Sequence, residues 1–313
     1  MNHAVGRAIV NVVRGGLIGV AEVIPGVSGG TIALIVGVYE SLIDGAGHLA
    51  RGVANLVVDV PRGRGARRAR THFSLVKWAV VLPVGVGMLV AIVIAAALVA
   101  PLIESHPEAT KAVFAGLIAT SLIVPIRMAG LPWRVRDVIL AFGAAALTFF
   151  LMGFAPLPPA QPSLILVGVA AAFAVCALVL PGVSGSFLLL TVGMYAPTLG
   201  AVNDRNFAYL GVFVLGALIG LGFFVSGLQW LLANHHRLTL VIMTGLMLGS
   251  LRALWPWQDE QNVLLAPSGN VGAYVGLFIA GAVGVLVLIV IELRLAKSGL
   301  IEMDVPEKTL ASA

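Results

Sequence analysis

The chain has 313 residues, of which 59% are apolar and only 11% are charged, with a net charge of +5 and a mean hydropathy of +1.04. A soluble globular domain carries about 25% charged residues, so the composition excludes a fold whose surface is covered by polar groups. In hydrocarbon every backbone N–H and C=O must be paired internally, which leaves helices or closed barrels. Long unbroken apolar runs favour helices over the alternating strands of a barrel. We therefore predict an all-α integral membrane protein.

Several apolar windows are long enough to cross a bilayer as helices. One of them, Val80–Ile103, contains no charged residue, and at about 1.5 Å rise per residue it exceeds a hydrocarbon core of roughly 30 Å. Further candidate spans follow along the chain: Val138–Phe154, Ser163–Leu180, Tyr209–Ala233, Leu238–Leu251 and Ala273–Ile291. The number of these windows predicts a protein that crosses the membrane several times.

The first apolar segment ends in Ile24–Gly30, here called the first motif, with the sequence IPGVSGG. Because proline has no N–H and glycine adopts almost any φ/ψ, Pro25 and Gly26 should break the helix. Ser28 is a favourable N-cap residue for the helix that resumes. Small residues follow it: Gly29, Gly30 and Thr31. The sequence therefore predicts a broken or re-entrant helix here.

A few ionisable residues lie in or beside apolar segments, where a charge is costly. Arg14 and Glu22 share roughly one helix face before the first motif. Glu22 could titrate, pair with an arginine or bind a coupling cation. Arg252 lies just before Trp255–Trp257, which is typical of an interfacial aromatic belt. Both arginines could contribute to an anion site or extend to the headgroups.

Arginines are concentrated between residues 51 and 70, where Asp59 is the only acid. A nucleic-acid patch would need aromatic partners or a folded module, and this segment has neither. We expect no nucleic-acid partner. The segment instead predicts a basic cytoplasmic loop over 51–72, which follows the positive-inside rule and rests on anionic headgroups.

The first motif recurs in the second half of the chain. Leu180–Ser186, the second motif, reads LPGVSGS, and Pro181 and Gly182 should break a second helix in the same way. Its small residues are Ser184, Gly185 and Ser186. Thr110–Ser121 also resembles Thr239–Ser250, in the same order along the chain. These matches predict an internal duplication.

The duplication divides the chain into a first membrane repeat, 1–153, and a second, 163–297. A proline-rich linker, 154–162, joins them, and a tail, 298–313, follows. Each repeat contains five apolar segments, or three crossings if those beside the motif form a re-entrant hairpin. Both numbers are odd, so the second repeat should enter from the opposite side, as in inverted-repeat transporters. With the basic loop inside, both termini are cytoplasmic.

A helix that starts behind each break presents free backbone N–H groups at the positive end of its dipole. Such a start favours phosphate or carboxylate, and glycine permits close approach. Inverted repeats would direct both starts, with the hydroxyls of Ser28 and Ser184, at one ligand near the midplane. Three other interpretations stay open: close helix packing at the small residues, a hinge, or a sodium site made by freed carbonyls.

The sequence lacks the signatures of a catalytic apparatus. It has no Walker loop, paired carboxylates or Ser-His-Asp arrangement, and its histidines have no zinc-ligand spacing. Cys176 is the single cysteine, so no intramolecular disulfide can form. We expect no cofactor and no metal, and transport is favoured over catalysis.

The residues around both motifs resemble the PopT-type polyprenyl-phosphate transporters, a bacterial membrane family. The leading signature is carried by Arg14–Gly16 and Gly19–Thr31. The second-half pattern is carried by Leu180–Gly185, Gly193–Tyr195, Gly245, Gly249, Ser250, Trp255 and Pro256. The resemblance runs from about residue 8 to 295. Glu22 stands where the family has aspartate at least as often, which preserves the charge.

The resemblance implies a multi-pass protein of the bacterial cytoplasmic membrane that returns undecaprenyl phosphate from the outer to the cytoplasmic leaflet, for reuse in cell-envelope synthesis. On this hypothesis the small residues of both motifs hold the phosphate: Ser28, Gly29, Gly30, Thr31, Ser184, Gly185 and Ser186. Arg14 and Arg252 would add positive charge. Glu22 would couple or gate transport, with a proton or sodium ion as its partner. A transporter of a small soluble anion and a membrane enzyme acting on a polyprenyl phosphate are the alternatives.

Overall fold

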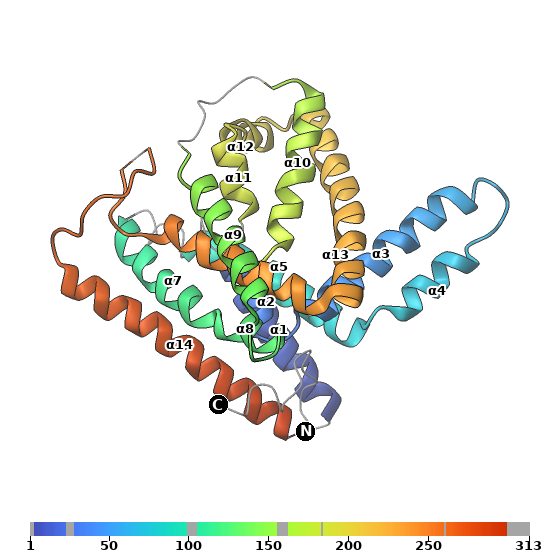
Figure 1. The fold of residues 1–313 in the computed structure, drawn as a ribbon. Helices are drawn as coiled ribbons and strands as arrows, with labels where there is room; N and C mark the ends of the chain where they lie inside the picture. The colour runs from blue at the N-terminus through green and yellow to red at the C-terminus, as the bar shows by residue number, and fades with distance from the viewer. Residues whose placement is uncertain are drawn as a thin grey trace.

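Helices dominate the structure, as the composition predicts. The computed structural model describes residues 3–22, 28–98, 105–154, 162–182, 184–259 and 261–298. In chain order (Figure 1) its helices are α1 (His3–Glu22), α2 (Gly29–Ile35), α3 (Tyr39–Asp59), α4 (Arg67–Leu75), α5 (Trp78–Leu98), α7 (Pro107–Ser121), α8 (Ile123–Met128), α9 (Val135–Leu151), α10 (Leu164–Val179), α11 (Gly185–Thr191), α12 (Tyr195–Asn203), α13 (Phe207–Ser250), the 3₁₀ helix η1 (Leu251–Leu254) and α14 (Val271–Lys297).

Four stretches of helix among the described residues are long and apolar enough to cross a membrane. They are Trp78–Ala95, Pro107–Met128, Phe207–Leu254 and Val271–Leu295. Large apolar side chains on such helices point outward, including Val93 at 72% and Phe223 at 82% exposure. An exposed apolar surface of this extent requires lipid as its solvent. The all-helical membrane class is therefore confirmed.

Two predicted spans join into one helix, which differs from the sequence prediction. Tyr209–Ala233 and Leu238–Leu251 both fall within α13, which continues across a kink at His235 (φ −135°, ψ 40°). The two windows were predicted as separate spans, but the backbone turns at one residue and needs no loop. We call the parts before and after His235 the first and second arms of α13. The predicted end of Val80–Ile103, beyond Leu98, lies outside the described residues.

Glycines let the helices pair at very short range. On the first arm of α13, a Cβ at Gly220 would lie 2.6 Å from Ala172 Cα of α10. On the second arm, a Cβ at Gly249 would lie 2.3 Å from the Ala145 carbonyl oxygen of α9. Similar contacts join α1 to α5 and α7 to α14. Small residues commonly permit such close backbone approach in membranes.

Replacing one of these glycines should destabilise the fold. A Cβ at Gly116 in α7 would lie 1.8 Å from the Phe278 carbonyl oxygen of α14, and overpacking costs about 1–3 kcal/mol. Gly116→Ala should therefore lower the unfolding temperature in detergent. Gly143→Ala is the control, because a Cβ at Gly143 meets nothing within 4 Å and alanine favours a helix. Equal unfolding temperatures for the two variants would contradict the close pairing of α7 and α14.

The basic segment over 51–72 is largely helical. Arg51 lies in α3, and Arg67, Arg68 and Arg70 lie in α4, so 51–72 is largely a helical hairpin (Figure 1). Gly63 and Gly65 have φ near +70° in the turn between the helices. The Nδ1 atoms of His48 and His72 lie 3.3 Å apart and join the two helices. Arginine is a good helix former, so a high charge does not by itself predict a loop.

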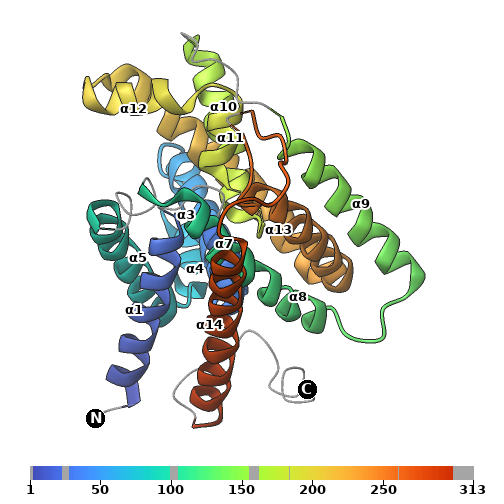
Figure 2. The ribbon, with the colours of Figure 1, turned by 90° about the vertical axis from the view of Figure 1, so that its left-hand side faces the viewer.

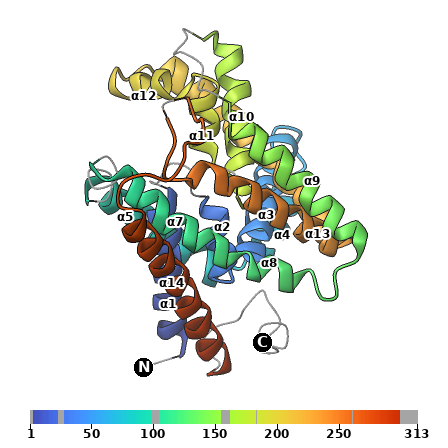
Figure 3. The same ribbon diagram turned by 60° about the vertical axis from the view of Figure 1, so that its left-hand side comes forward.

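The first motif leads into the centre of the molecule. Most of α2 is buried, and Thr31 and Val36 have 0% exposure. Figure 3 shows α2 among α3, α7 and α8, and all three helices contact it. Figures 1 and 2 place α10–α12 at one end of the molecule, with the starts of α1 and the C-terminal part of α14 towards the other. The core therefore surrounds the helix that follows the first motif.

Candidate functional site

The first motif separates α1 from α2. Helix α1 ends at Glu22 and α2 begins at Gly29, whereas Pro25 and Gly26, the predicted helix break, lie outside the described residues. Ser28 occupies the N-cap position with extended backbone (φ −105°, ψ 124°). Ser28 is therefore the N-cap residue, as predicted, but its side chain makes no capping hydrogen bond. The hydroxyl has another partner, described below.

The second motif separates α10 from α11, with Pro181 and Gly182 between them. Helix α10 ends at Val179 and α11 begins at Gly185. Gly182 has φ +82°, a conformation that glycine adopts without strain. A Cβ at this position would also lie 2.5 Å from Met247 Cα on the second arm of α13. The turn therefore requires glycine both for its backbone angle and for its contact.

The two motifs bind each other directly. The Ser28 hydroxyl donates a 3.0 Å hydrogen bond to the Leu180 carbonyl, a partner 152 residues away in the sequence. The Gly182 N–H donates to Thr31 Oγ1 at 2.9 Å. Ser28 is 2% exposed and Thr31 is 0% exposed. The hydroxyls of the first motif and its following helix thus pair with backbone groups that the second break leaves free.

A third hydrogen bond strengthens this junction. The Tyr39 hydroxyl donates to the Val179 carbonyl at 3.1 Å, at the end of α10. The last carbonyls of a helix have no intrahelical partner and need donors from elsewhere. The sequence analysis did not predict this role for Tyr39. A tyrosine about three turns after a helix break gives no signal of which carbonyl it will reach.

The start of α2 already holds an acidic side chain from the protein itself. The Glu22 carboxyl group reaches Gly29 at this helix start. A Cβ at Gly29 would lie 1.9 Å from Glu22 Oε1, so only glycine permits this contact. Glu22 therefore occupies the position that a bound anion would take at this helix start.

The remaining small residues of the motifs lie against backbone. A Cβ at Gly30 would lie 2.8 Å from the Val179 carbonyl oxygen, and one at Gly185 would lie 2.4 Å from that of Ala174. The hydroxyls of Ser184 and Ser186 are 3.0 Å apart. Both glycines therefore permit a close approach of backbone, in agreement with close helix packing, one of the interpretations left open for the motif. The serine pair remains beside the start of α11.

The two predicted arginines lie in different surroundings. Arg14 is 3% exposed and donates to Asn11 Oδ1 at 3.2 Å. Asn11 in turn donates to the Ala79 carbonyl of α5 at 3.1 Å. Arg14 is therefore buried in the protein.

Arg252 contacts α9 and the segment before α14. Its guanidinium carbon lies 4.6 Å from the centre of the Phe149 ring, and Nη2 donates to the Asn262 carbonyl at 3.3 Å. Its buried Nε has no hydrogen-bond partner among the residues that the structure describes. The contacts of this side chain run to α9 rather than to either motif.

Comparison with known proteins decides the family. The chain matches the family described as undecaprenyl phosphate translocase-like over residues 18–273. The chain belongs to this family. It is 35% identical over 263 residues to a polyprenyl-phosphate transporter of Vibrio cholerae, with 82% of this chain and 80% of that protein covered. A polyprenyl-phosphate transporter of Staphylococcus aureus is 27% identical over 263 residues, with coverage of 79% and 86%. No solved structure matches the chain.

This translocase-like chain also has an ion pair that the sequence analysis missed. Asp137 Oδ2 accepts hydrogen bonds from the Arg134 N–H at 2.9 Å and from Arg237 Nη2 at 2.7 Å. Both hydrogen bonds lower the pKa of Asp137, and the bond from the Arg134 backbone N–H has the larger effect. The pair joins the start of α9 to α13 beside the kink. An acid at the third position of a helix predicts a capping box, but not an arginine partner 100 residues away.

The lowered pKa of Asp137 predicts acid-sensitive stability. Its folded-state pKa lies below the unfolded value of about 4, so the ionised group stabilises the fold at neutral pH and loses this effect as the pH falls through the lowered pKa. Asp137→Asn should lower the unfolding temperature at pH 7 and weaken its decline below about pH 4. Exposed Asp204 provides the control, Asp204→Asn. An unchanged acid profile in Asp137→Asn would contradict the prediction.

Proposed function

We propose that the chain translocates polyprenyl phosphate across the bacterial cytoplasmic membrane, from the outer to the cytoplasmic leaflet, and that the two motifs hold the phosphate. The family and its relatives support the transported lipid and a transporter rather than an enzyme. The observation that carries the phosphate site is the direct pairing of Ser28 and Thr31 with the second break. A lipid phosphate needs polar partners at depth, whereas its tail can stay in hydrocarbon.

The phosphate exchanges partners with the protein in this mechanism. The Ser28 hydroxyl turns from the Leu180 carbonyl and donates to a phosphate oxygen. The Thr31 hydroxyl, which accepts the Gly182 N–H in the structure, releases this group and also donates to the phosphate. Ser184 and Ser186, whose hydroxyls lie within hydrogen-bonding distance of each other, contribute from the second motif. Gly29, Gly30 and Gly185 allow backbone N–H groups to approach the lipid. The hydrogen bonds between the two motifs are then present only when no phosphate is bound.

Glu22 competes with the phosphate in this proposal. Its carboxyl group lies against Gly29, whose N–H is one of the groups that the phosphate needs. Two anions at this distance repel strongly in a medium of low dielectric. Phosphate binding therefore requires Glu22 to withdraw or to take up a proton, and return of the carboxylate expels the lipid. This exchange assigns Glu22 the coupling or gating role, with a proton favoured over sodium.

The two halves act as inverted repeats in this account. Each motif leads into a helix of 7 residues, α2 or α11. Helix α1 pairs with α5, as α10 does with the first arm of α13. Helix α7 pairs with α14, as the second arm of α13 does with α9. Suppose that α7 corresponds to the second arm of α13, and α9 to α14. The duplication then converts the pair of α7 and α14 into the pair of the second arm and α9, so both pairs follow from one relation, which supports a duplication.

Positive charge completes the proposed site and its orientation. Arg14, although buried and bonded to Asn11, and Arg252, whose Nε has no hydrogen-bond partner among the described residues, would draw an anionic headgroup inward through their positive charge. The exposed arginines of the α3–α4 hairpin would rest on anionic headgroups at the cytoplasmic face. This orientation puts both termini in the cytoplasm.

Reconstitution tests the proposed function. Vesicles carrying the purified protein should deplete polyprenyl phosphate from one leaflet at least tenfold faster than empty vesicles, because an unaided phosphate must cross hydrocarbon. Neutral polyprenol, which lacks the phosphate, controls for membrane disturbance and should move equally fast in both preparations. Equal rates for polyprenyl phosphate with and without protein would refute transport.

A further inference from the structure

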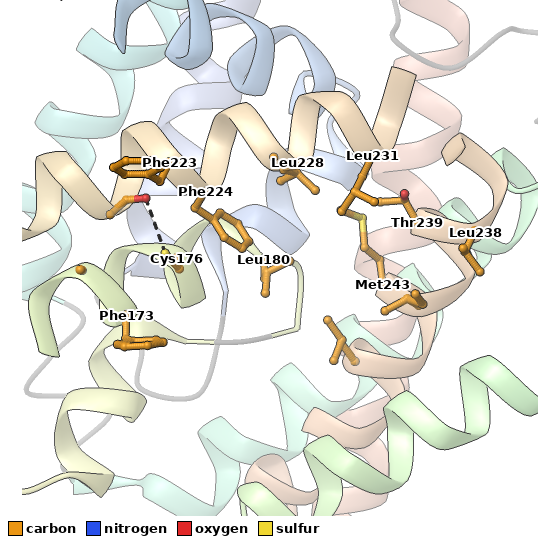
Figure 4. A pocket seen from close by; sticks show the side chains of 15 residues that line it. Phe173, Cys176, Leu180, Phe223, Phe224, Leu228, Leu231, Leu238, Thr239 and Met243 are labelled. Atoms are coloured by element: carbon orange, nitrogen blue, oxygen red, sulfur yellow. Dashed lines mark hydrogen bonds between the residues drawn. The ribbon is translucent and has the colours of Figure 1, made fainter. Parts of the chain in front are cut away.

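An apolar pocket lies in the concave side of the kinked helix α13, against α10. Its volume is about 590 Å³. Figure 4 shows Phe173, Cys176 and Leu180 on one side, with Phe223, Phe224 and Leu228 facing them from the first arm of α13. Leu238, Thr239, Ile242, Met243 and Leu246 of the second arm close the far end. The kink at His235 therefore creates the hollow between the two arms.

The wall of this pocket offers no polar partner to a ligand. The Thr239 hydroxyl donates to the His235 carbonyl at 3.0 Å. The Cys176 thiol donates to the Gly220 carbonyl at 3.7 Å. The other lining residues have apolar side chains or none. A phosphate would be left without hydrogen bonds here, so the pocket suits a hydrocarbon ligand only.

The rim of the pocket is open to the surroundings of the protein. Phe173 is 63% exposed and Phe223 is 82% exposed, although both line the pocket. In a membrane protein such exposed rings face lipid. A hydrocarbon chain can therefore enter sideways from the bilayer and needs no aqueous path.

The inner end of the pocket reaches the second motif. Leu180 lines the pocket, and its carbonyl accepts the Ser28 hydroxyl. Leu246 also lines the pocket, and a Cβ on Gly182 would lie 2.5 Å from Cα of the next residue, Met247. The apolar wall thus ends beside the protein groups that are proposed to bind the phosphate.

We infer that this pocket holds the part of the polyprenyl chain next to the phosphate. The inference rests on the proposed function, because the two motifs supply the headgroup site beside it. A volume of about 590 Å³ lies within the roughly 300–1,000 Å³ of small-molecule sites, so it accommodates a few isoprene units and leaves the rest in the bilayer. The pocket would fix the lipid at its first units and make transport depend on them.

Gly227 provides a way to fill the pocket without damage to the helix. It lines the pocket, and an added Cβ meets nothing within 4 Å. Gly227→Phe should lower translocation of polyprenyl phosphate at least tenfold. Gly211→Phe is the matched control, because Gly211 lies on the same arm, also has open space at its Cβ and is not part of the pocket wall. It should retain wild-type flux, and equal flux in the two variants would overturn the inference.

Photolabelling separates this inference from the proposed function, because it reads binding without transport. A polyprenyl phosphate with a diazirine on an early isoprene unit should label α10 and α13 around the pocket. Gly227→Phe should reduce the labelling, and unlabelled polyprenyl phosphate should compete for it far better than phosphatidylglycerol. Equal competition by phosphatidylglycerol would overturn the inference and identify a general acyl-chain crevice. Labelling elsewhere would also overturn it, even with normal transport; pocket labelling without transport would sustain it and refute only the proposed function.

Discussion

Ser28→Ala should lower the flux of polyprenyl phosphate about 10- to 100-fold, because a hydrogen bond to a charged group is worth about 1.5–3 kcal/mol. The hydroxyl is buried and now donates to the Leu180 carbonyl. In the proposed mechanism it transfers to the phosphate when the lipid binds. Leaflet-resolved flux in reconstituted vesicles measures the effect.

Tyr39→Phe separates this role from a structural one. The Tyr39 hydroxyl also joins the two halves, through the Val179 carbonyl, but it is not among the proposed phosphate ligands. Removing it should cost a comparable amount of stability, about 1 kcal/mol, with little change in flux. If Ser28→Ala and Tyr39→Phe reduced flux equally, Ser28 would act only through the junction between the motifs.

Glu22→Gln should have the second large effect: it should raise the affinity for polyprenyl phosphate and lower its flux. The glutamine keeps the size of the side chain but cannot carry the negative charge that, in the proposed mechanism, opposes phosphate at Gly29. Purified protein should therefore bind polyprenyl phosphate more tightly, by at least tenfold if the repulsion exceeds about 1.4 kcal/mol. Flux should fall by a similar factor, because the group that expels the lipid is lost.

Glu40→Gln controls for the loss of one carboxylate nearby. Glu40 lies at the start of α3, where its carboxylate pairs with His236 at 2.9 Å rather than with Gly29. The affinity of the Glu40→Gln variant for polyprenyl phosphate should match that of the wild type. Unchanged affinity and flux in Glu22→Gln would remove Glu22 from the mechanism.

The sequence predicted the class of fold because composition acts on every residue at once. A chain with so little charge has no soluble surface, and windows such as Ser163–Leu180 coincide with helices such as α10 to within a residue. The break around Pro181 and Gly182 also lies where the missing N–H and the free backbone of these residues predict it.

Contacts between distant residues could not be predicted in the same way. The Ser28 hydroxyl had a local role available as a cap, and only the folded chain brings the Leu180 carbonyl within its reach. The pairing of Asp137 with Arg237 depends on how α9 meets α13. Likewise, the arginines of α4 are compatible with both loop and helix. Such choices are decided by tertiary packing, which no local pattern encodes.

The most direct test of the paired phosphate site is the leaflet-resolved flux of polyprenyl phosphate with wild-type protein and with the double variant Ser28→Ala/Ser184→Ala. Both proteins should be matched for amount, folding and orientation in the vesicles. We expect rapid wild-type flux and a rate close to that of empty vesicles for the double variant, because each motif loses a hydroxyl that the phosphate needs. Undiminished flux in the double variant would contradict the account.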